Sequence, residues 1–191
     1  MRLRLRNAAL ELYAERGFDR TTAAEVAVLA GVTERTYFRH FPDKREVLFD
    51  GEAELEVSLS DAVASAPELA PLAVLRHAFL SLVPQFESDR DLNGRRDRVV
   101  SATPELRERG YTKLAHLSEA VADALERRGI RRPLALLAAS CGIEVLSRVR
   151  REWLAGSPRS YAALLTDAFA DLDLLARGGA AQDVPPSAPR P

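Results

Sequence analysis

At 191 residues and 21.0 kDa, with 47% hydrophobic residues, the chain is long enough to bury a core of its own. Its 27 basic and 28 acidic residues nearly cancel, which excludes a nucleic-acid affinity that rests on overall charge, so any such affinity must come from locally placed cations. A single cysteine, Cys141, excludes an internal disulfide, and no apolar run approaches the roughly 18 residues of a membrane span, so we expect a soluble, cytoplasmic protein.

The first predicted element is an amphipathic helix at the start of the chain. Apolar residues recur at helical spacing from Leu3 to Arg16, and Gly17 ends the pattern. Arg4 and Arg6 lie near its beginning, ahead of the first acidic residue. We therefore assign both arginines to contacts with a phosphate backbone.

Two short helices are predicted next. Thr22 and Glu25 have the spacing of a capping box, which indicates that a helix starts between them. Gly31 suits the left-handed backbone that ends this helix, and Thr33 is placed to cap a second one over residues 34–41. Small and apolar residues around the turn allow the two helices to cross steeply. This is the pattern of a helix-turn-helix, whose second helix enters the major groove of DNA.

The second of these helices has the side chains of a DNA-contact surface. Arg35 and Arg39 lie one turn apart and can read a guanine edge or clamp a phosphate. For either arginine alone, a solvated helix face is the plain alternative. Phe38 is predicted either to join the core or to contact a thymine methyl group. The other residues assigned to DNA contact, mostly through phosphate, are Thr22, Thr33, Thr36, Tyr37, His40 and Lys44.

The remainder of the chain also shows helical spacing throughout. Asp43 and Glu46 repeat the capping-box spacing and predict a fourth helix that reaches about Val63. Pro84 is predicted to bend or end the helix that follows, and Asn93-Gly94 to form a turn in the polar stretch after it. The further helical patterns cover residues 72–86, 104–128, 134–154 and 158–175.

These patterns predict an all-α protein of about nine helices, because no strand alternation is present. We divide it into a helix-turn-helix DNA-binding domain over residues 1–46, a helical ligand-binding and dimerisation domain over residues 47–177, and a proline-rich tail over residues 178–191. The composition of the tail predicts disorder.

The first quarter of the chain also contains short motifs in a fixed order. They are AALELY, GF, TT, VA, AGVT and TYFRHFP with a lysine two residues later, between Ala8 and Lys44. In this order they resemble the N-terminal domain of TetR/AcrR-type transcriptional regulators. Such regulators usually have a leucine or phenylalanine followed by a tyrosine before the Arg39-His40 position, whereas this chain has Tyr37-Phe38. The phenol is therefore expected to have moved by one residue, about 100° around the helix.

The resemblance implies a homodimeric repressor. Two copies of the helix-turn-helix, about 34–36 Å apart, would bind successive major grooves of a pseudo-palindromic operator. A small-molecule effector, expected to be hydrophobic, would favour a body shape with the wrong spacing and so release the DNA. Small and aliphatic residues such as Ala135, Ala139, Leu165 and Phe169 in the last two helices are expected to form the dimer interface as a four-helix bundle.

A ligand cavity between the body helices is implied in the same way. Core packing is the plain alternative for each apolar candidate, because apolar side chains at helical spacing usually form core. Glu144 would either anchor a ligand or pair with Arg148 one turn away. The candidate lining residues are Phe79, Phe86, Tyr111, Leu114, Leu117, Cys141, Glu144 and Trp153.

Other classes of function find less support. We expect no cofactor, no metal site and no enzymatic activity, because catalytic motifs are absent and His77 and His116 lack the spacing of paired ligands. The alternative function is a helical ligand-binding or interaction protein with a degenerate DNA-binding head. Within the family, residues 34–41 and 98–106 together with Trp153 are similar to regulators of mycofactocin systems, some of which respond to acyl-CoA.

Overall fold

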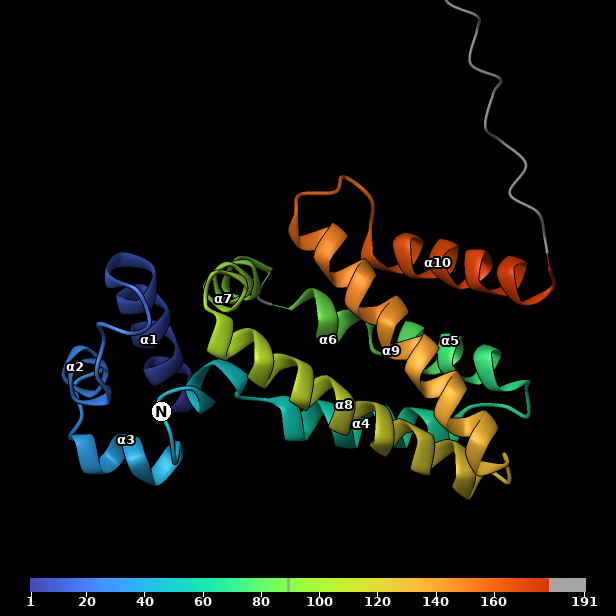
Figure 1. Ribbon diagram of the computed structural model, residues 1–191, viewed down its shortest axis with the longest axis horizontal. Coiled ribbons are helices and arrows are strands. Elements are labelled where there is room, and N and C mark those ends of the chain that lie inside the picture. Colours follow the sequence, from blue (N-terminus) through green and yellow to red (C-terminus); the bar gives the residue numbers. More distant parts are fainter. Residues whose placement is uncertain (89, 179–191) are drawn as a thin grey trace, which may run out of the picture.

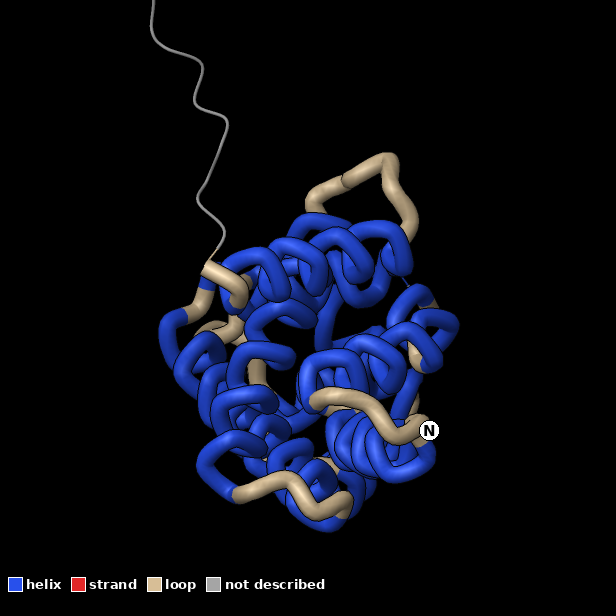
Figure 2. The backbone as a smooth tube through the Cα atoms, turned by 90° about the vertical axis from the view of Figure 1, so that its right-hand side faces the viewer, coloured by secondary structure: helices blue, strands red, loops and turns tan. Residues whose placement is uncertain are grey.

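The computed structural model describes residues 1–88 and 90–178, and within these ranges the protein is all helical, as predicted (Figures 1 and 2). The proline-rich tail from residue 179 onward lies outside the described residues. In chain order the helices are α1 (Arg2–Arg16), α2 (Ala23–Leu29), α3 (Glu34–His40), the 3-10 helix η1 (Glu46–Phe49), α4 (Glu52–Ser65), α5 (Pro71–Ser81), α6 (Val83–Glu87), α7 (Arg90–Ala102), α8 (Pro104–Arg127), α9 (Arg132–Leu154) and α10 (Tyr161–Ala176).

Two hydrophobic clusters divide the molecule into what we call the head (α1–α3 and η1) and the body (α4–α10). The head cluster is not closed by its own helices. Leu92 and Val99 of α7 and Leu106 of α8 are buried in it together with residues of α1 and η1. Figure 1 accordingly shows α7 between α1 and the long body helices. Because α7 shares side chains with the head, the head and the body are packed against each other directly.

The body cluster is centred on α5, which packs against α4, α9 and α10. Phe79 of α5 is fully buried, and its ring lies 5.9 Å from that of Phe169 in an edge-on arrangement. Gly142 of α9 permits this close packing, because a Cβ atom there would lie 2.8 Å from Cδ1 of Leu75 and 3.5 Å from the Phe79 ring. The interior of the body is therefore tightly filled where α5 meets α9.

The residues predicted as a dimer face are part of this core instead. Ala135, Ala139 and Leu165 are fully buried within one chain, and Phe169 is 1% exposed. The choice of these residues was wrong because α5 covers the inward side of α9 and α10, whereas the use of the two helices for dimerisation stays a prediction. A partner chain can reach only the opposite faces of these two helices.

The predicted helix start at Asp43 is also corrected. The Asp43 carboxylate accepts hydrogen bonds from the amide of Arg45, at 2.7 Å, and from its guanidinium group. Glu46 does not return to the capping position, because it accepts from Nε of Arg109 at 2.8 Å. The chain forms η1, turns at Gly51 with a φ of +91°, and only then begins α4.

Around Pro84 and in the polar stretch after it, one prediction is confirmed and one is wrong. As expected near Pro84, α5 ends at Ser81 and α6 begins at Val83. Asn93 and Gly94, however, lie within α7 rather than in a turn. Burial of side chains on both sides of Gly94 in the head cluster stabilises the helix there, and tertiary packing overrides the local preference.

The last helix begins slightly later than predicted. Ser160, rather than Ser157-Pro158, caps α10, because its hydroxyl accepts a hydrogen bond from the amide of Ala163 at 3.2 Å. The other long helices, α8 and α9, agree with the predicted ranges within a few residues.

Candidate nucleic-acid interface

The start of α2 is fixed by a complete capping box, as predicted. The Thr22 hydroxyl accepts from the amide of Glu25 at 3.2 Å, and the Glu25 carboxylate accepts from the amide of Thr22 at 2.8 Å. The same carboxylate accepts from the Thr22 hydroxyl at 2.9 Å. The hydrogen bonds from Thr22 lower the pKa of the Glu25 carboxyl, and the bond from the backbone amide has the largest effect. The first turn of α2 is therefore held in place by a charged group at its own N-terminus.

The turn between α2 and α3 depends on a glycine and an arginine. Gly31 has a φ of +67°, in the left-handed region that the sequence predicted. The guanidinium group of Arg4 donates to the carbonyl oxygen of Ala30, and its Nη2 lies 3.0 Å from where a Cβ of Gly31 would be. Arg4 was assigned to phosphate contact, but the structure places it as a tie between α1 and this turn.

The N-terminus of α3 is capped as predicted. The Thr33 hydroxyl accepts from the amide of Thr36 at 3.2 Å, and the two hydroxyl oxygens are 3.0 Å apart. Beyond this cap, the exposed face of α3 carries Arg35, Phe38 and Arg39. Glu34 is exposed on the same face and was not assigned from the sequence. Its spacing of four residues from Phe38 is the signal that would have included it.

Tyr37 was predicted to contact DNA, but the structure buries it in the head. Its side chain is fully buried, and its hydroxyl donates to the carbonyl oxygen of Lys44 at 3.3 Å. Tyr13 donates to the same oxygen at 2.9 Å. Burial raises the pKa of both phenols, so both remain protonated donors. Tyr37 therefore belongs to the head core, and Phe38 is the aromatic residue that α3 presents to solvent.

Lys44 also has a structural role. Its ammonium group donates to the carbonyl oxygens of Phe18, at 3.0 Å, and Thr21, at 3.3 Å, and lies 4.0 Å from the centre of the Phe18 ring. These contacts tie the segment after α3 to the loop between α1 and α2. An ammonium group has three donors, so one remains for a phosphate. Arg6 and His40 are half-buried.

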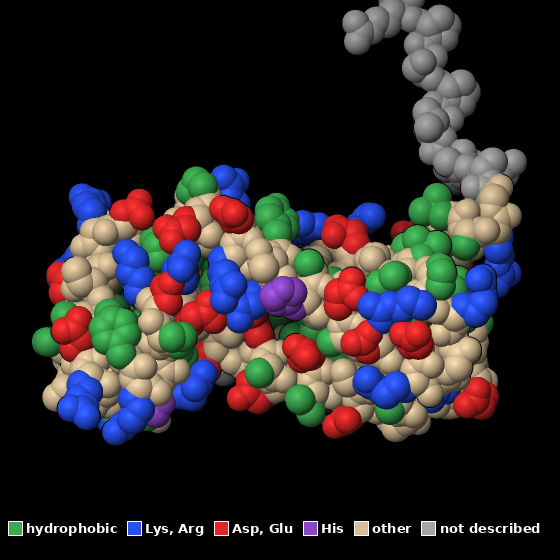
Figure 3. Space-filling view, turned by 60° about the horizontal axis from the view of Figure 1, so that its bottom comes forward, with side chains coloured by type: hydrophobic (Ala, Val, Ile, Leu, Met, Phe, Trp, Pro, Cys, Tyr) green, Lys and Arg blue, Asp and Glu red, His purple; other side chains and the backbone are tan. Residues whose placement is uncertain are grey.

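Arg35 and Arg39 differ from most cations of the head because no residue in the described part of the chain pairs with them. Within residues 1–88 and 90–178, neither guanidinium group makes a hydrogen bond or an ion pair, while Arg2, Arg16 and Arg45 pair with carboxylates. Figure 3 shows Lys and Arg side chains gathered with a histidine at the lower corner of the head, whereas both charge signs mix over the body. The exposed face of α3 thus presents two free positive charges around an exposed aromatic ring, a combination suited to the DNA groove.

The predicted ligand residues of the body do not converge. Phe79 and Trp153 are core, and Phe86 packs against the ring of Tyr161, 5.4 Å between centroids. Glu144 is exposed and pairs with Arg151 at 3.0 Å rather than with Arg148. The remaining candidates lie on the α8 and α9 surface, with Tyr111 and Leu114 exposed and Leu117 and Cys141 half-buried.

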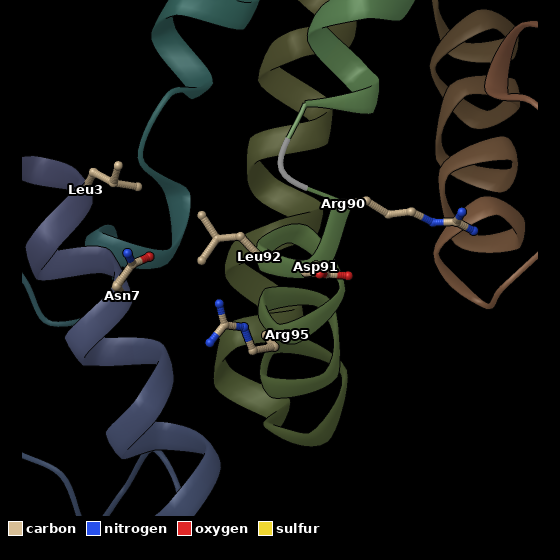
Figure 4. A pocket seen from close by; sticks show the side chains of 6 residues that line it. All are labelled: Leu3, Asn7, Arg90, Asp91, Leu92 and Arg95. Carbon is tan, nitrogen blue, oxygen red and sulfur yellow. The ribbon is translucent and has the colours of Figure 1, made fainter.

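Two open hollows occur elsewhere on the described part of the chain. One, of about 340 Å³, lies between α9 and α10, and the other, of about 370 Å³, lies between α1 and α7. Figure 4 shows Leu3 and Asn7 of α1 opposite Leu92 and Arg95 of α7 in the second hollow. Arg90 extends away from it, donates to the carbonyl oxygen of Trp153 and stacks 4.4 Å from that ring. None of the eight predicted ligand residues lines either hollow.

No group of three or more His, Cys, Asp or Glu side chains among residues 1–88 and 90–178 is arranged to hold a metal ion. In the same ranges no helix combines the length and apolar character that crossing a bilayer requires.

Two family descriptions match the chain. Residues 5–50 match the family described as bacterial regulatory proteins, tetR family, and residues 69–177 match the MftR C-terminal domain. The first match contains most of α1 and all of α2 and α3, with the interface described above, and the second covers α5–α10.

Individual relatives agree with these matches. The chain is 30% identical over 126 residues to MftR of Mycobacterium tuberculosis, a protein named for transcriptional regulation of mycofactocin biosynthesis, covering 64% of this chain and 62% of that protein. It is 34% identical over 91 residues to TtgR of Pseudomonas putida, an HTH-type transcriptional regulator, covering 46% of this chain and 43% of TtgR. The chain thus spans less than two thirds of the length of these curated relatives.

Solved structures resemble the whole chain. FadR of Thermus thermophilus, described as a TetR-family transcriptional repressor in complex with lauroyl-CoA, is 27% identical, with a TM-score of 0.55 and complete coverage of both chains. FadR of Bacillus subtilis, solved in complex with stearoyl-CoA, is 16% identical, with a TM-score of 0.59 over 92% of this chain and 98% of that one. At that identity the second likeness shows the fold alone.

Proposed function

The chain belongs to the TetR family of bacterial transcriptional regulators, with an MftR-type C-terminal domain, and from this premise we propose that it is a homodimeric, ligand-released repressor that binds a pseudo-palindromic operator in the cytoplasm. Proteins of this family are regulators rather than enzymes. The proposal covers what the family membership leaves open, namely the sign of regulation, the assembly, the DNA contacts and the effector.

One observation carries the DNA half of the proposal. Arg35 and Arg39 are exposed on α3 and have no partner within the described residues. A free guanidinium group on the helix that enters the groove can release counterions from phosphate or bind a guanine edge. The alternative of a degenerate head fits less well, because these exposed cations lie on a helix whose N-terminal cap and preceding left-handed turn are intact. We assign Arg35, Phe38 and Arg39 to the groove and Thr22, Thr36 and Lys44 to the backbone.

The homodimer is proposed on the outward faces of α9 and α10. Leu137 is 63% exposed and Leu174 is 53% exposed, on the sides of these helices that α5 does not cover. The hollow between the helices is lined by Arg148 and Glu152 of α9 and by Asp167 and Asp171 of α10, and Asp167 pairs with Arg159. A two-fold axis pairs such a surface with its own copy, so that basic groups meet acidic groups and leucines meet apolar surface. Two heads are also what a short recognition helix needs for specificity.

The effector is proposed to be hydrophobic and acyl-like, since acyl-CoA occupies the relative from Thermus thermophilus. The interior where such a chain would lie is filled by Phe79 and its neighbours. Binding would therefore have to separate α5 from α9. Because α7 contributes Leu92 and Val99 to the head cluster, a displaced body moves the head as well. The ligand would shift the population toward a head spacing that no longer matches successive grooves.

The direct test is a mobility-shift titration on the intergenic DNA upstream of the gene at several salt concentrations. We expect Arg39→Ala to weaken binding and to reduce the slope of log affinity against log salt, because one cation fewer then displaces counterions from the DNA. Arg76→Ala is the matched control, because Arg76 is exposed on α5 and has no partner in the described residues. Unchanged binding by Arg39→Ala, or equal losses in both variants, would contradict the assignment of α3.

A further inference from the structure

The exposed face of α3 carries one large apolar side chain. Phe38 is 47% exposed, although an aromatic residue of this size is usually buried when core is available. The head core lies directly beside it and is filled at this point by Tyr37. The chain therefore places an aromatic ring outward, between Arg35 one turn before it and Arg39 immediately after it.

The ring of Phe38 is held in place rather than loosely exposed. It packs edge-on against the ring of Tyr37, with centroids 5.4 Å apart and planes at 81°. Tyr37 is itself fixed by burial and by its hydrogen bond to the carbonyl oxygen of Lys44. A phenylalanine has only two side-chain torsions, so little entropy is lost when such a supported ring meets a surface.

The chemistry of the groove limits what this ring can recognise. Phe38 has no hydrogen-bond donor or acceptor, so it cannot read the polar edges of adenine, guanine or cytosine. The major groove displays one apolar feature, the C5 methyl group of thymine, and contact with it is a recognised mode of readout by phenylalanine. The flanking guanidinium groups would meanwhile bind phosphate or guanine on either side.

We propose that Phe38 is a specificity-determining residue that selects thymine in each operator half-site through the C5 methyl group. The inference rests on the proposed function, since it requires α3 to lie in the major groove. It adds a base identity to that function, and it can fail while the function stands.

The test removes the methyl group alone. Operator sequences are first selected from random duplex DNA with the full-length protein, and each thymine of one half-site is then replaced by deoxyuridine, which keeps the base-pair hydrogen bonds. At one position we expect the wild-type affinity to fall about fourfold, the value of about 0.8 kcal/mol for one buried methyl-sized group. The Phe38→Ala variant should bind the thymine and uracil duplexes equally.

Val28→Ala provides the matched control. Val28 is an apolar residue of the same head with 77% exposure, but it lies on α2. This variant should keep the fourfold preference for thymine, and circular dichroism would verify that both variants fold. If wild-type protein binds its selected operator but no uracil substitution lowers the affinity, or if Phe38→Ala keeps the full preference, the inference is overturned and the proposed function stands. If selection yields no specific DNA, both are overturned.

Discussion

Arginines on α3 of the head and at the start of α9 of the body have opposite surroundings. On α3, Arg35 and Arg39 have no partner in the described residues. On α9, Arg132 pairs with the carboxylates of Glu119, Asp123 and Glu126. An arginine count therefore says little about DNA binding in a chain of net charge −1. What matters is where the protein leaves cations unneutralised.

Phenylalanine shows the same contrast. Phe38 of the head is half exposed on a helix that faces outward, whereas Phe79 of the body is completely enclosed. Both were candidates for binding in the sequence. The structure makes the first available to a partner and gives the second a packing role, so the two residues provide a pair of matched substitutions.

The largest predicted effect is on Phe79. We expect Phe79→Ala to lower the free energy of unfolding by about 3–5 kcal/mol, because the substitution leaves a cavity against Phe169 and Leu75. Urea unfolding followed by the fluorescence of Trp153, the single tryptophan and a member of the same cluster, measures it. The matched Phe38→Ala change should cost no more than about 0.5 kcal/mol. A loss below about 1 kcal/mol for Phe79→Ala would instead favour an unfilled ligand cavity beside it.

The second prediction separates positioning from contact within the head. Arg4→Ala removes the hydrogen bond to the Ala30 carbonyl and should weaken operator binding by about 1 kcal/mol through a looser turn. Because the structure places Arg4 against the turn rather than on the contact surface, the slope of log affinity against log salt should not change. Arg39→Ala should reduce that slope. Salt titrations of both variants on one operator give the comparison, and a reduced slope for Arg4→Ala would return this residue to the contact surface.

The sequence predicted the head well because its determinants are local. The capping box of Thr22 and Glu25, the left-handed Gly31 and the Thr33 cap each act within a few residues, so spacing alone identifies them. The assignment of Tyr37 to DNA contact was wrong. Burial of its ring depends on the distant Tyr13 and Lys44 segments, which no local pattern reports.

The body was predicted in outline only. Helical spacing predicted its helices, but it could not show which face of each helix packs against α5 and which is exposed to solvent. Tyr111 and Phe79 satisfy the same pattern, and one is 69% exposed while the other is fully buried. The bond from Arg90 to the Trp153 carbonyl joins residues 63 positions apart and has no sequence signal. The helix start predicted from the spacing of Asp43 and Glu46 was wrong for the same reason. Glu46 accepts a hydrogen bond from the distant Arg109 on α8 instead.

The smallest predicted effect concerns the junction of the head and the body, where two carboxylates share Lys113. Burial raises the pKa of Glu46, but hydrogen bonds from Arg109 and Lys113 outweigh burial and leave the pKa below its ordinary value of 4.5. Burial also raises the pKa of Glu52, and there it outweighs the nearby charges of Arg96 and Lys113, so the pKa lies above its ordinary value. The two groups are therefore expected to respond to acid with opposite signs.

The stabilisation from Glu46 is present above the ordinary pKa and is lost as the pH falls through the lowered one. The stabilisation from Glu52 is present below the ordinary pKa and is lost as the pH rises through the raised one. Urea unfolding from about pH 7 to about pH 4 tests this. Relative to wild type, Glu46→Gln should make the loss of stability on acidification shallower, and Glu52→Gln should make it steeper. Shifts of the same sign in both variants would mean that one of the two carboxylates is not held at the junction as the structure shows.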